Sequence, residues 1–362
     1  MRNNILKTAI YILFLFWAGV SFAESFCPLI GAIRWDAWHG KTGKVGQYVE
    51  KVLSDPKWYY RLPFCSEIME DSININCATV EAMNKEVEYA NYGKIDYWAF
   101  LVYPPNSEMS EQLKLYLSNT QKFKPKFTVI IEFGRYSPQN FRDRNDYYLE
   151  IMKKNTYLKI NNRPVVFIFN IDEKRLQDLW GEEENFKMVI NDLTTKVKEA
   201  GFDKPYYIVM DFNPEKASKW VDMFGFDAIS TYATHPGKRG TYQDLVKHTQ
   251  KEWERAKRTG KTVIPIVMSG WDPRPRGENP PPWATKEYIK KAGEVYFLGP
   301  TPEDISQHVR KAINWAKENN SPLIIIYAWN EFDEGGWIMP TLLNGSERLR
   351  AIREVIEEEC AR

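Results

Sequence analysis

The chain has 362 residues, of which 43% are hydrophobic and 27% charged, and its net charge is +1. These proportions exclude a highly charged disordered chain, and the balance of 49 basic against 48 acidic residues excludes a basic surface for nucleic acid. Only four histidines argue against several histidine-rich metal sites. The aromatic content is high, with 13 Trp, 20 Tyr and 19 Phe, and such rings either fill a core or form flat surfaces for ligands.

Residues 1–23 predict a secretory signal peptide. Arg2 and Lys7 supply a positive start, residues 9–20 form a short apolar run, and residues 21–23 fit a cleavage site. An uncleaved membrane anchor is the alternative. We expect an exported protein, periplasmic or extracellular, whose mature part spans residues 24–362 as one domain. After cleavage we expect no stable membrane insertion, because no later segment is long and apolar enough.

The mature chain alternates between two kinds of segment. Eight nearly continuous apolar runs predict parallel strands buried on both faces, at residues 29–35, 95–103, 127–133, 164–170, 206–212, 226–232, 263–268 and 323–329. Amphipathic stretches predict helices at residues 80–92, 108–121, 139–155, 173–200, 214–224, 242–258, 301–319 and 341–359. Eight strands and eight helices are the count of an α/β fold, a closed (β/α)₈ TIM barrel. An open doubly wound sheet is the alternative, and the lack of a glycine-rich phosphate loop favours closure.

Two insertions stand out from this alternation. Residues 41–78 extend the first βα loop and contain the aromatic run at 58–60. Residues 272–285, DPRPRGENPPPWAT, are stiffened by prolines. Both insertions follow the carboxyl ends of predicted strands, where the active sites of barrels lie.

The mature part contains four cysteines, Cys27, Cys65, Cys77 and Cys360. An even number in an oxidising compartment indicates disulfides, and four cysteines allow three pairings. We favour Cys65–Cys77, which closes a local loop. We also favour Cys27–Cys360, because the first strand of a barrel begins on the face where its last helix ends. Free buried thiols are the alternative, and no cysteine spacing indicates a zinc site.

Polar and aromatic residues gather where the predicted strands end, so we expect them to share one pocket. The candidate substrate-binding residues are Trp35, Asp36, Trp38, His39, Tyr103, Glu132, Asn170, Asp211, Tyr232, His235, Trp271, Asp272, Arg274, Trp329, Asn330 and Trp337. Trp and Tyr rings stack on the C–H faces of sugars, whereas Asp, Asn and Arg side chains form hydrogen bonds with hydroxyl groups.

Each of these residue types has a structural alternative. Trp35, Trp271 and Trp329 can equally belong to the core. Asp36 and Asp272 can cap loops. We expect Arg274 and Arg276 to form a solvated rim. A divalent metal held by aspartates is a further alternative, with Asp36, Asp172, Asp211 and Asp272 as the candidates. We assign no metal and no cofactor.

Two glutamates, Glu331 and Glu334, lie in the segment NEFDEGG at residues 330–336. Gly335 and Gly336 allow a sharp turn, which can bring both carboxyl groups onto one wall. Cleavage of a glycosidic bond requires two carboxyl groups, one of which donates a proton to the leaving oxygen. A like-charged neighbour and partial burial raise the pKa of one of them. A charge pattern at a helix N-terminus is the alternative.

Three segments together resemble the family 99 glycoside hydrolases and the related WbsX-like proteins. They are YLKINNRPVV at residues 157–166, PIVMSGWD at 265–272 and AWNEFDEG at 328–335. The resemblance implies a (β/α)₈ fold and a retaining, endo-acting hydrolase of α-mannoside type. It also implies that Glu331 is a base at the sugar 2-hydroxyl and that Glu334 is the general acid/base. Where characterised endomannosidases have an aromatic residue and a histidine between the two glutamates, this chain has Phe332 and Asp333.

Two other functions remain open. In a non-catalytic glycan-binding barrel of a surface polysaccharide system, both glutamates would only accept hydrogen bonds. A metal-dependent hydrolase would require clustered Asp and His ligands. In every case the expected partner is a carbohydrate, and the sequence leaves the sugar, the linkage and the oligomeric state open.

Overall fold

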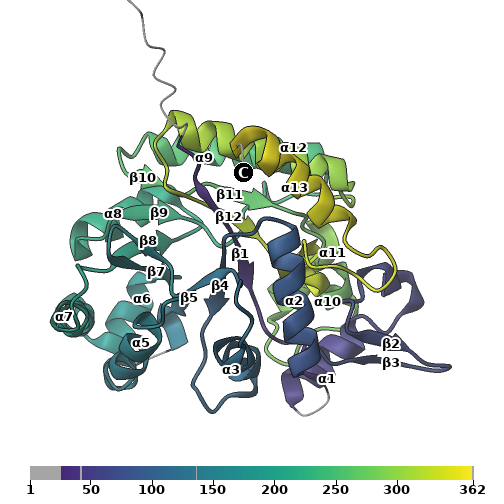
Figure 1. Ribbon diagram of the computed structural model, residues 1–362, viewed down its shortest axis with the longest axis horizontal. Coiled ribbons are helices and arrows are strands. Elements are labelled where there is room, and N and C mark those ends of the chain that lie inside the picture. The colour runs from purple at the N-terminus through teal and green to yellow at the C-terminus, as the bar shows by residue number, and fades with distance from the viewer. Residues whose placement is uncertain (1–25, 41–42, 136, 361–362) are drawn as a thin grey trace, which may run out of the picture.

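The structure is a computed structural model, and it describes residues 26–40, 43–135 and 137–360. The predicted signal peptide lies outside the described residues. Nine parallel strands form the central sheet (Figure 1): β1 (Leu29–Arg34), β4 (Tyr97–Leu101), β5 (Lys126–Glu132), β7 (Arg163–Phe169), β8 (Tyr206–Met210), β9 (Ala228–Ser230), β10 (Thr262–Val263), β11 (Ile266–Met268) and β12 (Leu323–Tyr327). β6 (Lys159–Ile160) adds an antiparallel pairing to β7. The eight predicted strands are therefore present.

The predicted strand at residues 263–268 is divided into β10 and β11. Thr262 of β10 pairs with β9, whereas Ile266 of β11 pairs with β12. Pro265 lies between them and has no N–H to donate, but its carbonyl accepts a hydrogen bond of 3.2 Å from the N–H of Ile325. The order of paired strands runs from β10 at one end to β11 at the other, and these two strands are consecutive in the chain. The two ends of the sheet therefore meet at Pro265, which confirms the (β/α)₈ fold class.

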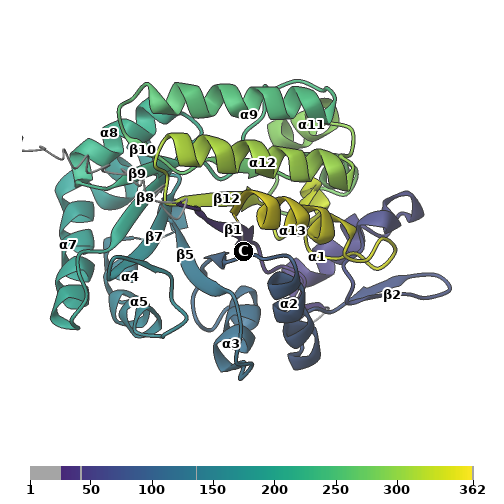
Figure 2. The same cartoon turned by 45° about the horizontal axis from the view of Figure 1, so that its top comes forward.

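Helices alternate with the strands and cover the outside of the sheet (Figure 2). They are α2 (Val80–Tyr92), α3 (Glu111–Ser118), α4 (Pro138–Arg142), α5 (Asn145–Met152), α6 (Glu173–Arg175), α7 (Glu183–Glu199), α8 (Pro214–Phe224), α9 (Tyr242–Lys257), α12 (Pro302–Glu318) and α13 (Glu347–Cys360). The helix predicted at 173–200 is interrupted by η5 (Leu176–Trp180). The chain leaves the helical path between η5 and α7, at Gly181, whose φ of 75° lies in the left-handed region.

Both insertions carry secondary structure that the sequence did not predict. The first contains α1 (Lys44–Val52), η2 (Pro56–Arg61) and the hairpin of β2 (Ser66–Ile68) and β3 (Ile73–Ile75). The second forms α10 (Arg274–Glu278) and leads into α11 (Lys286–Glu294). The remaining short elements are η3 (Glu108–Ser110), η4 (Phe133–Arg135), β13 (Asn330–Glu331), η6 (Phe332–Glu334) and β14 (Gly336–Trp337).

Both favoured disulfides are present. Cys27–Cys360 joins Cys27, two residues before β1, to the last residue of α13, with a Cα–Cα distance of 5.5 Å. Cys65–Cys77 brackets the β2–β3 hairpin, with a Cα–Cα distance of 5.2 Å. Within the described ranges, none of the helices is both long and apolar enough to cross a membrane.

Candidate functional site

A cavity of about 450 Å³ opens where the strands of the barrel end. Its walls come from nearly every βα loop, so residues far apart in the sequence meet there. The described lining residues are Trp35, Val45, Leu101, Tyr103, Met109, Glu132, Phe169, Phe212, Tyr232, Ala233, Trp271, Arg276, Trp283, Tyr288, Glu331 and Glu334. The cavity therefore combines aromatic walls with a small set of charged groups, which is the usual composition of a ligand site.

Glu331 and Glu334 are brought together by a tight turn after β12. β13 pairs antiparallel with β14, and η6 connects them. Gly335 has a φ of 80°, and a Cβ atom there would lie 2.6 Å from the backbone nitrogen of Asp272. Only glycine fits this position without strain. The turn buries both glutamates, which are 3% and 8% exposed, at the wall of one cavity.

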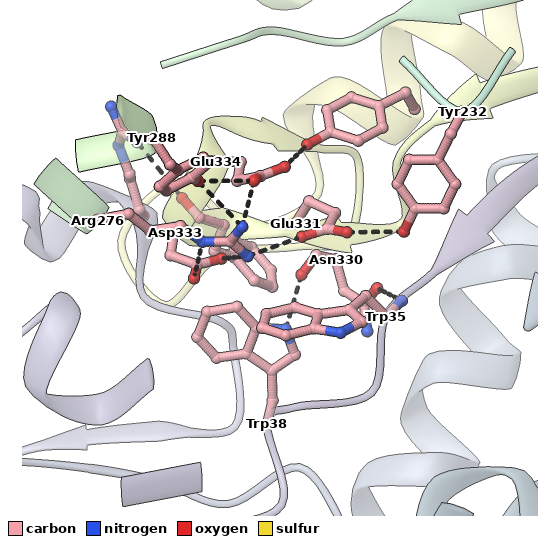
Figure 3. A network of polar contacts seen from close by, with 12 residues as sticks. Trp35, Trp38, Tyr232, Arg276, Tyr288, Asn330, Glu331, Asp333 and Glu334 are labelled. Atoms are coloured by element: carbon pink, nitrogen blue, oxygen red, sulfur yellow. Dashed lines mark hydrogen bonds and ion pairs between the residues drawn. The ribbon is translucent and has the colours of Figure 1, made fainter. Parts of the chain in front are cut away.

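Arg276 of α10 is the cation of this site. Its guanidinium group forms ion pairs with Glu331 Oε2 at 3.3 Å, with Asp333 Oδ2 at 2.6 Å and with Glu334. It also lies 4.8 Å from the ring of Trp35. The expectation of a solvated rim is wrong for Arg276, because α10 turns the proline-rich segment inward. One guanidinium thus faces three carboxyl groups (Figure 3).

Three tyrosines donate hydrogen bonds to the two glutamates. Tyr232 donates to Glu331 Oε1 at 2.8 Å. Tyr288 of α11 donates to Glu334 Oε1 at 3.0 Å, and Tyr327, the last residue of β12, donates to Glu334 Oε2. Figure 3 shows Tyr232 and Tyr288 approaching from opposite sides of the pair. These contacts fix the orientation of both carboxyl groups.

Burial controls the protonation of this cluster. It raises the pKa of Glu331 well above its ordinary value, and the charge of Glu334 raises it further, while Arg276 acts in the opposite direction. Burial also raises the pKa of Asp333, against the opposing charge of Arg276. Glu331 therefore keeps its proton to a higher pH than an exposed glutamic acid does.

A buried hydrogen-bond network beneath the cavity fixes the first loop. The side chain of Asn330 accepts a hydrogen bond of 2.9 Å from the N–H of Trp35 and donates one of 3.2 Å to Asp36. The carbonyl oxygen of Asn330 accepts a hydrogen bond of 2.7 Å from Trp38 Nε1. Trp35 donates in turn to the hydroxyl of Tyr103 at 3.0 Å. Asp36, Trp38 and Asn330 therefore lie behind the wall that Trp35 and Tyr103 form.

Trp329 belongs to the core. It is fully buried, and its Nε1 donates a hydrogen bond of 2.7 Å to Glu86. Glu86 and Asp36 both pair with Arg34, at 2.7 and 3.0 Å. This buried ion cluster lies below the site and does not line the cavity.

Several other predicted binding residues also lie away from the cavity. Asp211 accepts a hydrogen bond from the N–H of Asn213 and borders a separate small pocket. His39 is buried and pairs through its backbone with Asn76. Asn170, just after β7, has a φ of 63° and donates its N–H to the carbonyl of Met210, the last residue of β8.

Three of the remaining predicted residues border two adjoining cavities, and a fourth, Arg274, pairs with one of them. Asp272 and Trp337 line one of them, and His235 lines the other. Arg274 pairs with Asp272 at 2.7 Å. Burial lowers the pKa of His235 to about 4, and its ring lies 4.9 Å from that of Trp271, which borders all three cavities.

The four aspartates of the metal alternative do not form one group. Asp36 and Asp272 pair with arginines, whereas Asp172 and Asp211 share Lys216. Across the described ranges, three or more His, Cys, Asp or Glu side chains nowhere form a group that could hold a metal ion. The acidic residues Glu331 and Glu334 of the cavity are instead paired with Arg276 and the tyrosines.

The sequence predicted the two glutamates and Tyr232 as site residues but gave no indication of Tyr288 and Tyr327. Tyr327 lies within the strand predicted at 323–329 and ends the observed strand β12, so it was assigned to the strand and not to the site. Tyr288 lies on α11, for which no strand-end rule applies.

Comparison with known proteins identifies the family and the fold of this chain. The sequence matches the family described as Glycosyltransferase WbsX over residues 119–352, which is more than half of the chain. The curated proteins gave no match. Among solved structures, the GH99 endo-alpha-mannosidase from Bacteroides thetaiotaomicron, in complex with bis-tris-propane, is similar with a TM-score of 0.57 and 17% identity. The similarity covers 92% of this chain and 98% of that one.

A second structure of the GH99 endo-alpha-mannosidase from the same organism gives a TM-score of 0.55 at 15% identity, over 91% of this chain and 97% of that one. At these identities the similarity establishes the fold, which is a glycoside-hydrolase-like barrel. The chain therefore belongs to the WbsX family and has the barrel fold of the GH99 endo-alpha-mannosidases.

Proposed function

We propose that this protein is an exported glycoside hydrolase that cleaves a glycosidic bond within a poly- or oligosaccharide. The observation that carries the proposal is the pair of Glu331 and Glu334, buried side by side at the wall of an aromatic cavity of about 450 Å³. Cleavage of a glycosidic bond requires two carboxyl groups that face one sugar-sized cavity, and this pair meets that requirement. The two disulfides support export to an oxidising compartment.

The aromatic walls suit a sugar chain. Trp35 and Tyr103 are joined by a hydrogen bond and present a fixed surface at the floor. Phe212 and Trp283 line the cavity but are 61% and 54% exposed. Exposed rings at the rim of an enclosed pocket offer stacking surfaces for sugars next to the one that is cleaved. This arrangement supports endo action.

The proposed chemistry follows the roles that the family resemblance implies. Glu331 removes the proton of the sugar 2-hydroxyl, whose oxygen attacks the anomeric carbon while the glycosidic bond breaks. Glu334 gives its proton to the leaving oxygen. The attack leaves a three-membered ring of the 2-oxygen, C1 and C2. Glu334 then takes a proton from water, and the water oxygen opens this ring at the anomeric carbon. Glu331 returns its proton to the 2-oxygen. Two inversions at the same carbon retain its configuration.

The pair must carry one proton between its two carboxyl groups for this sequence to start. Arg276, Tyr288 and Tyr327 all direct hydrogen bonds to Glu334, whereas Tyr232 holds Glu331. These donors position the carboxyl groups and compensate the charge that moves between them.

Sugar transfer is the second candidate, because the family description names a glycosyltransferase. A nucleotide-sugar donor requires free cations or a metal ion for its diphosphate. Among the described residues that line the cavity, Arg276 is the cation, and it is already paired with three carboxyl groups. This charge balance favours a neutral glycan over a nucleotide sugar as the donor.

The decisive experiment is to incubate the purified mature protein with a panel of α-linked oligosaccharides and to read the product anomer by NMR. We expect early release of a product with retained configuration. Glu334→Gln and Glu331→Gln should each lower kcat on an unactivated glycan by about 10²–10⁴-fold, since each removes a proton-transfer group.

The matched control is Glu287→Gln, an exposed glutamate of α11, which should keep full activity. Folding of every variant is checked by circular dichroism. Near-normal turnover by Glu334→Gln contradicts the assignment. Turnover that depends on added nucleotide sugar supports transfer. Glycan binding without any cleavage supports the non-catalytic alternative.

A further inference from the structure

A second cavity, of about 250 Å³, lies on the other side of the turn that carries the glutamates. Glu334 lines the first cavity, whereas Gly335 and Trp337 line the second. The N–H of Asp272 donates a hydrogen bond of 2.6 Å to the carbonyl of Glu334, so the two walls are joined. The second cavity is thus enclosed by the loops after β11 and β12.

Among the described residues, Arg348 faces this cavity without a carboxylate partner. Its guanidinium carbon lies 3.7 Å from the ring centroid of Trp337, and Nη1 donates a hydrogen bond of 2.6 Å to the carbonyl of Trp337. The charged or ionisable groups that act on it most strongly are Tyr242, Arg61 and Tyr60, none of which is a carboxyl group. Burial lowers the pKa of Arg348 to about 9. Arg348 is partly buried, and charges withdrawn from water are normally paired, so its guanidinium group is open to an anionic partner.

Arg61 adds a second cationic group to the same wall. It is 1% exposed and pairs with Asp272. Asp272 also accepts hydrogen bonds of 2.7 and 2.8 Å from Arg274. One carboxylate therefore balances two guanidinium groups, and Arg348 adds a further positive charge. The charged residues that line the cavity are two cations, Arg61 and Arg348, and two carboxylates, Asp272 and Glu347. Asp272 is occupied by Arg61 and Arg274, so Arg348 is the cation of this wall that has no ion pair among the described residues.

The rest of the cavity is aromatic, with Tyr60, Trp271, Phe297 and Trp337 among its lining residues. Glu347 and Arg348 begin α13, so the positive end of that helix dipole adjoins the cavity. In (β/α)₈ barrels generally, the loops after the seventh and eighth strands often form an anion site. Position, charge and wall composition point to the same ligand chemistry.

We propose that this cavity binds the oxyanion group of a small ligand, a carboxylate, sulfate or phosphate, through Arg348. The flat walls accommodate the body that carries the anion, which can be a charged sugar or the free ion alone. Gly335 lines this cavity, and Glu334 of the same turn lines the first cavity. A bound anion therefore restricts the movement of the loop that holds Glu334. The proposal concerns binding and does not depend on the proposed hydrolysis.

The test is a titration of the intact mature chain followed by tryptophan fluorescence, because Trp337 lies against Arg348. Sodium phosphate, sodium sulfate and sodium glucuronate are added at an ionic strength kept constant with sodium chloride. We expect a saturable change with at least one oxyanion. Saturation by glucuronate identifies a carboxylated sugar as the ligand type, and saturation by phosphate or sulfate alone identifies the free ion or its ester.

Arg348→Gln should weaken that binding at least tenfold, and the exposed Arg350→Gln on the same helix should leave it unchanged. Asn344→Asp provides an independent variant, because Asn344 lines the cavity, uses its backbone N–H for the local turn and keeps Arg348 intact. The added carboxylate should occupy Arg348 and abolish binding. The proposal is overturned if none of the three oxyanions saturates the response, or if both variants bind as tightly as the original chain.

Discussion

At the scale of single residues, the site depends on one guanidinium group that serves three carboxyl groups. Removing water from such a cluster is costly, and the ion pairs with Arg276 and the tyrosine hydrogen bonds offset that cost. Asp333 is the member that does not line the cavity, yet it accepts two hydrogen bonds from Arg276, at 2.6 and 3.2 Å. Its negative charge raises the pKa of Glu331. Asp333 is therefore a positioning residue, which holds Arg276 in place and raises the pKa of Glu331 without lining the cavity.

We expect Asp333→Asn to move the acid limb of the pH profile of kcat/KM downwards by roughly one pH unit. The pKa of Glu331 is raised, so Glu331 is protonated in acid and becomes an active base only as the pH rises through that value. Removing the charge of Asp333 lowers this pKa. Glu287→Gln, at an exposed side chain that pairs with Lys291, should leave the limb in place. If the acid limb of Asp333→Asn stays at the same pH or moves to higher pH, the charge of Asp333 does not raise the pKa of Glu331.

At the scale of elements, the turn between β13 and β14 decides where the carboxyl groups point. Its left-handed residue, Gly335, is packed against the backbone of Asp272. The turn therefore tolerates no side chain there, and its geometry is transmitted directly to Glu334.

We expect Gly335→Ala to lower kcat by at least tenfold while KM changes less, because the turn must shift and Glu334 moves with it. The strained backbone should also cost about 1–3 kcal/mol of stability. Gly260→Ala is the matched control, since Gly260 has a φ of 75° but no atom of the described residues lies within 4 Å of the point where its Cβ would stand. Equal kcat losses in the two variants would mean that backbone strain alone, and no displacement of Glu334, lowers the activity.

The sequence predicted the strands and the glutamate pair because both follow strong local rules. Continuous apolar runs mark buried strands, and residues just after them lie at the functional end of a barrel. These rules do not predict Arg276 and Tyr288, because the two residues lie on short helices whose path depends on tertiary packing. Arg276 lies on α10 in the second insertion, and Tyr288 lies on α11 just after it. Trp38 and Trp329 were predicted to bind ligand but are fully buried, because the direction of a side chain is no longer set by strand alternation once the strand has ended.

At the scale of the whole molecule, the two disulfides act over different lengths of chain. Cys27–Cys360 spans 333 residues and ties the start of β1 to the end of α13, whereas Cys65–Cys77 spans 12. Closing a longer loop removes more entropy from the unfolded chain. The first bond is thus a global restraint and the second a local one.

We expect the Cys65→Ser/Cys77→Ser variant to lose about 3 kcal/mol of unfolding free energy and the Cys27→Ser/Cys360→Ser variant to lose more, up to about 5 kcal/mol. Urea unfolding at neutral pH measures both. The wild-type chain in the presence of a reductant serves as the reference for loss of both bonds. A larger loss from the short loop would contradict the entropic account.

The division of the seventh strand at Pro265 gives the barrel a seam. Two residue pairs join β10 to β9 and three join β11 to β12, whereas five join β4 to β5. Short ladders open at lower free energy than long ones, so amide hydrogens there should exchange with solvent before those of the opposite wall. The insertion that supplies Arg276 and leads to Tyr288 begins a few residues beyond this seam. Local opening of the barrel at this seam would therefore displace Arg276, the counter-ion of the glutamate pair, before the other residues of the site.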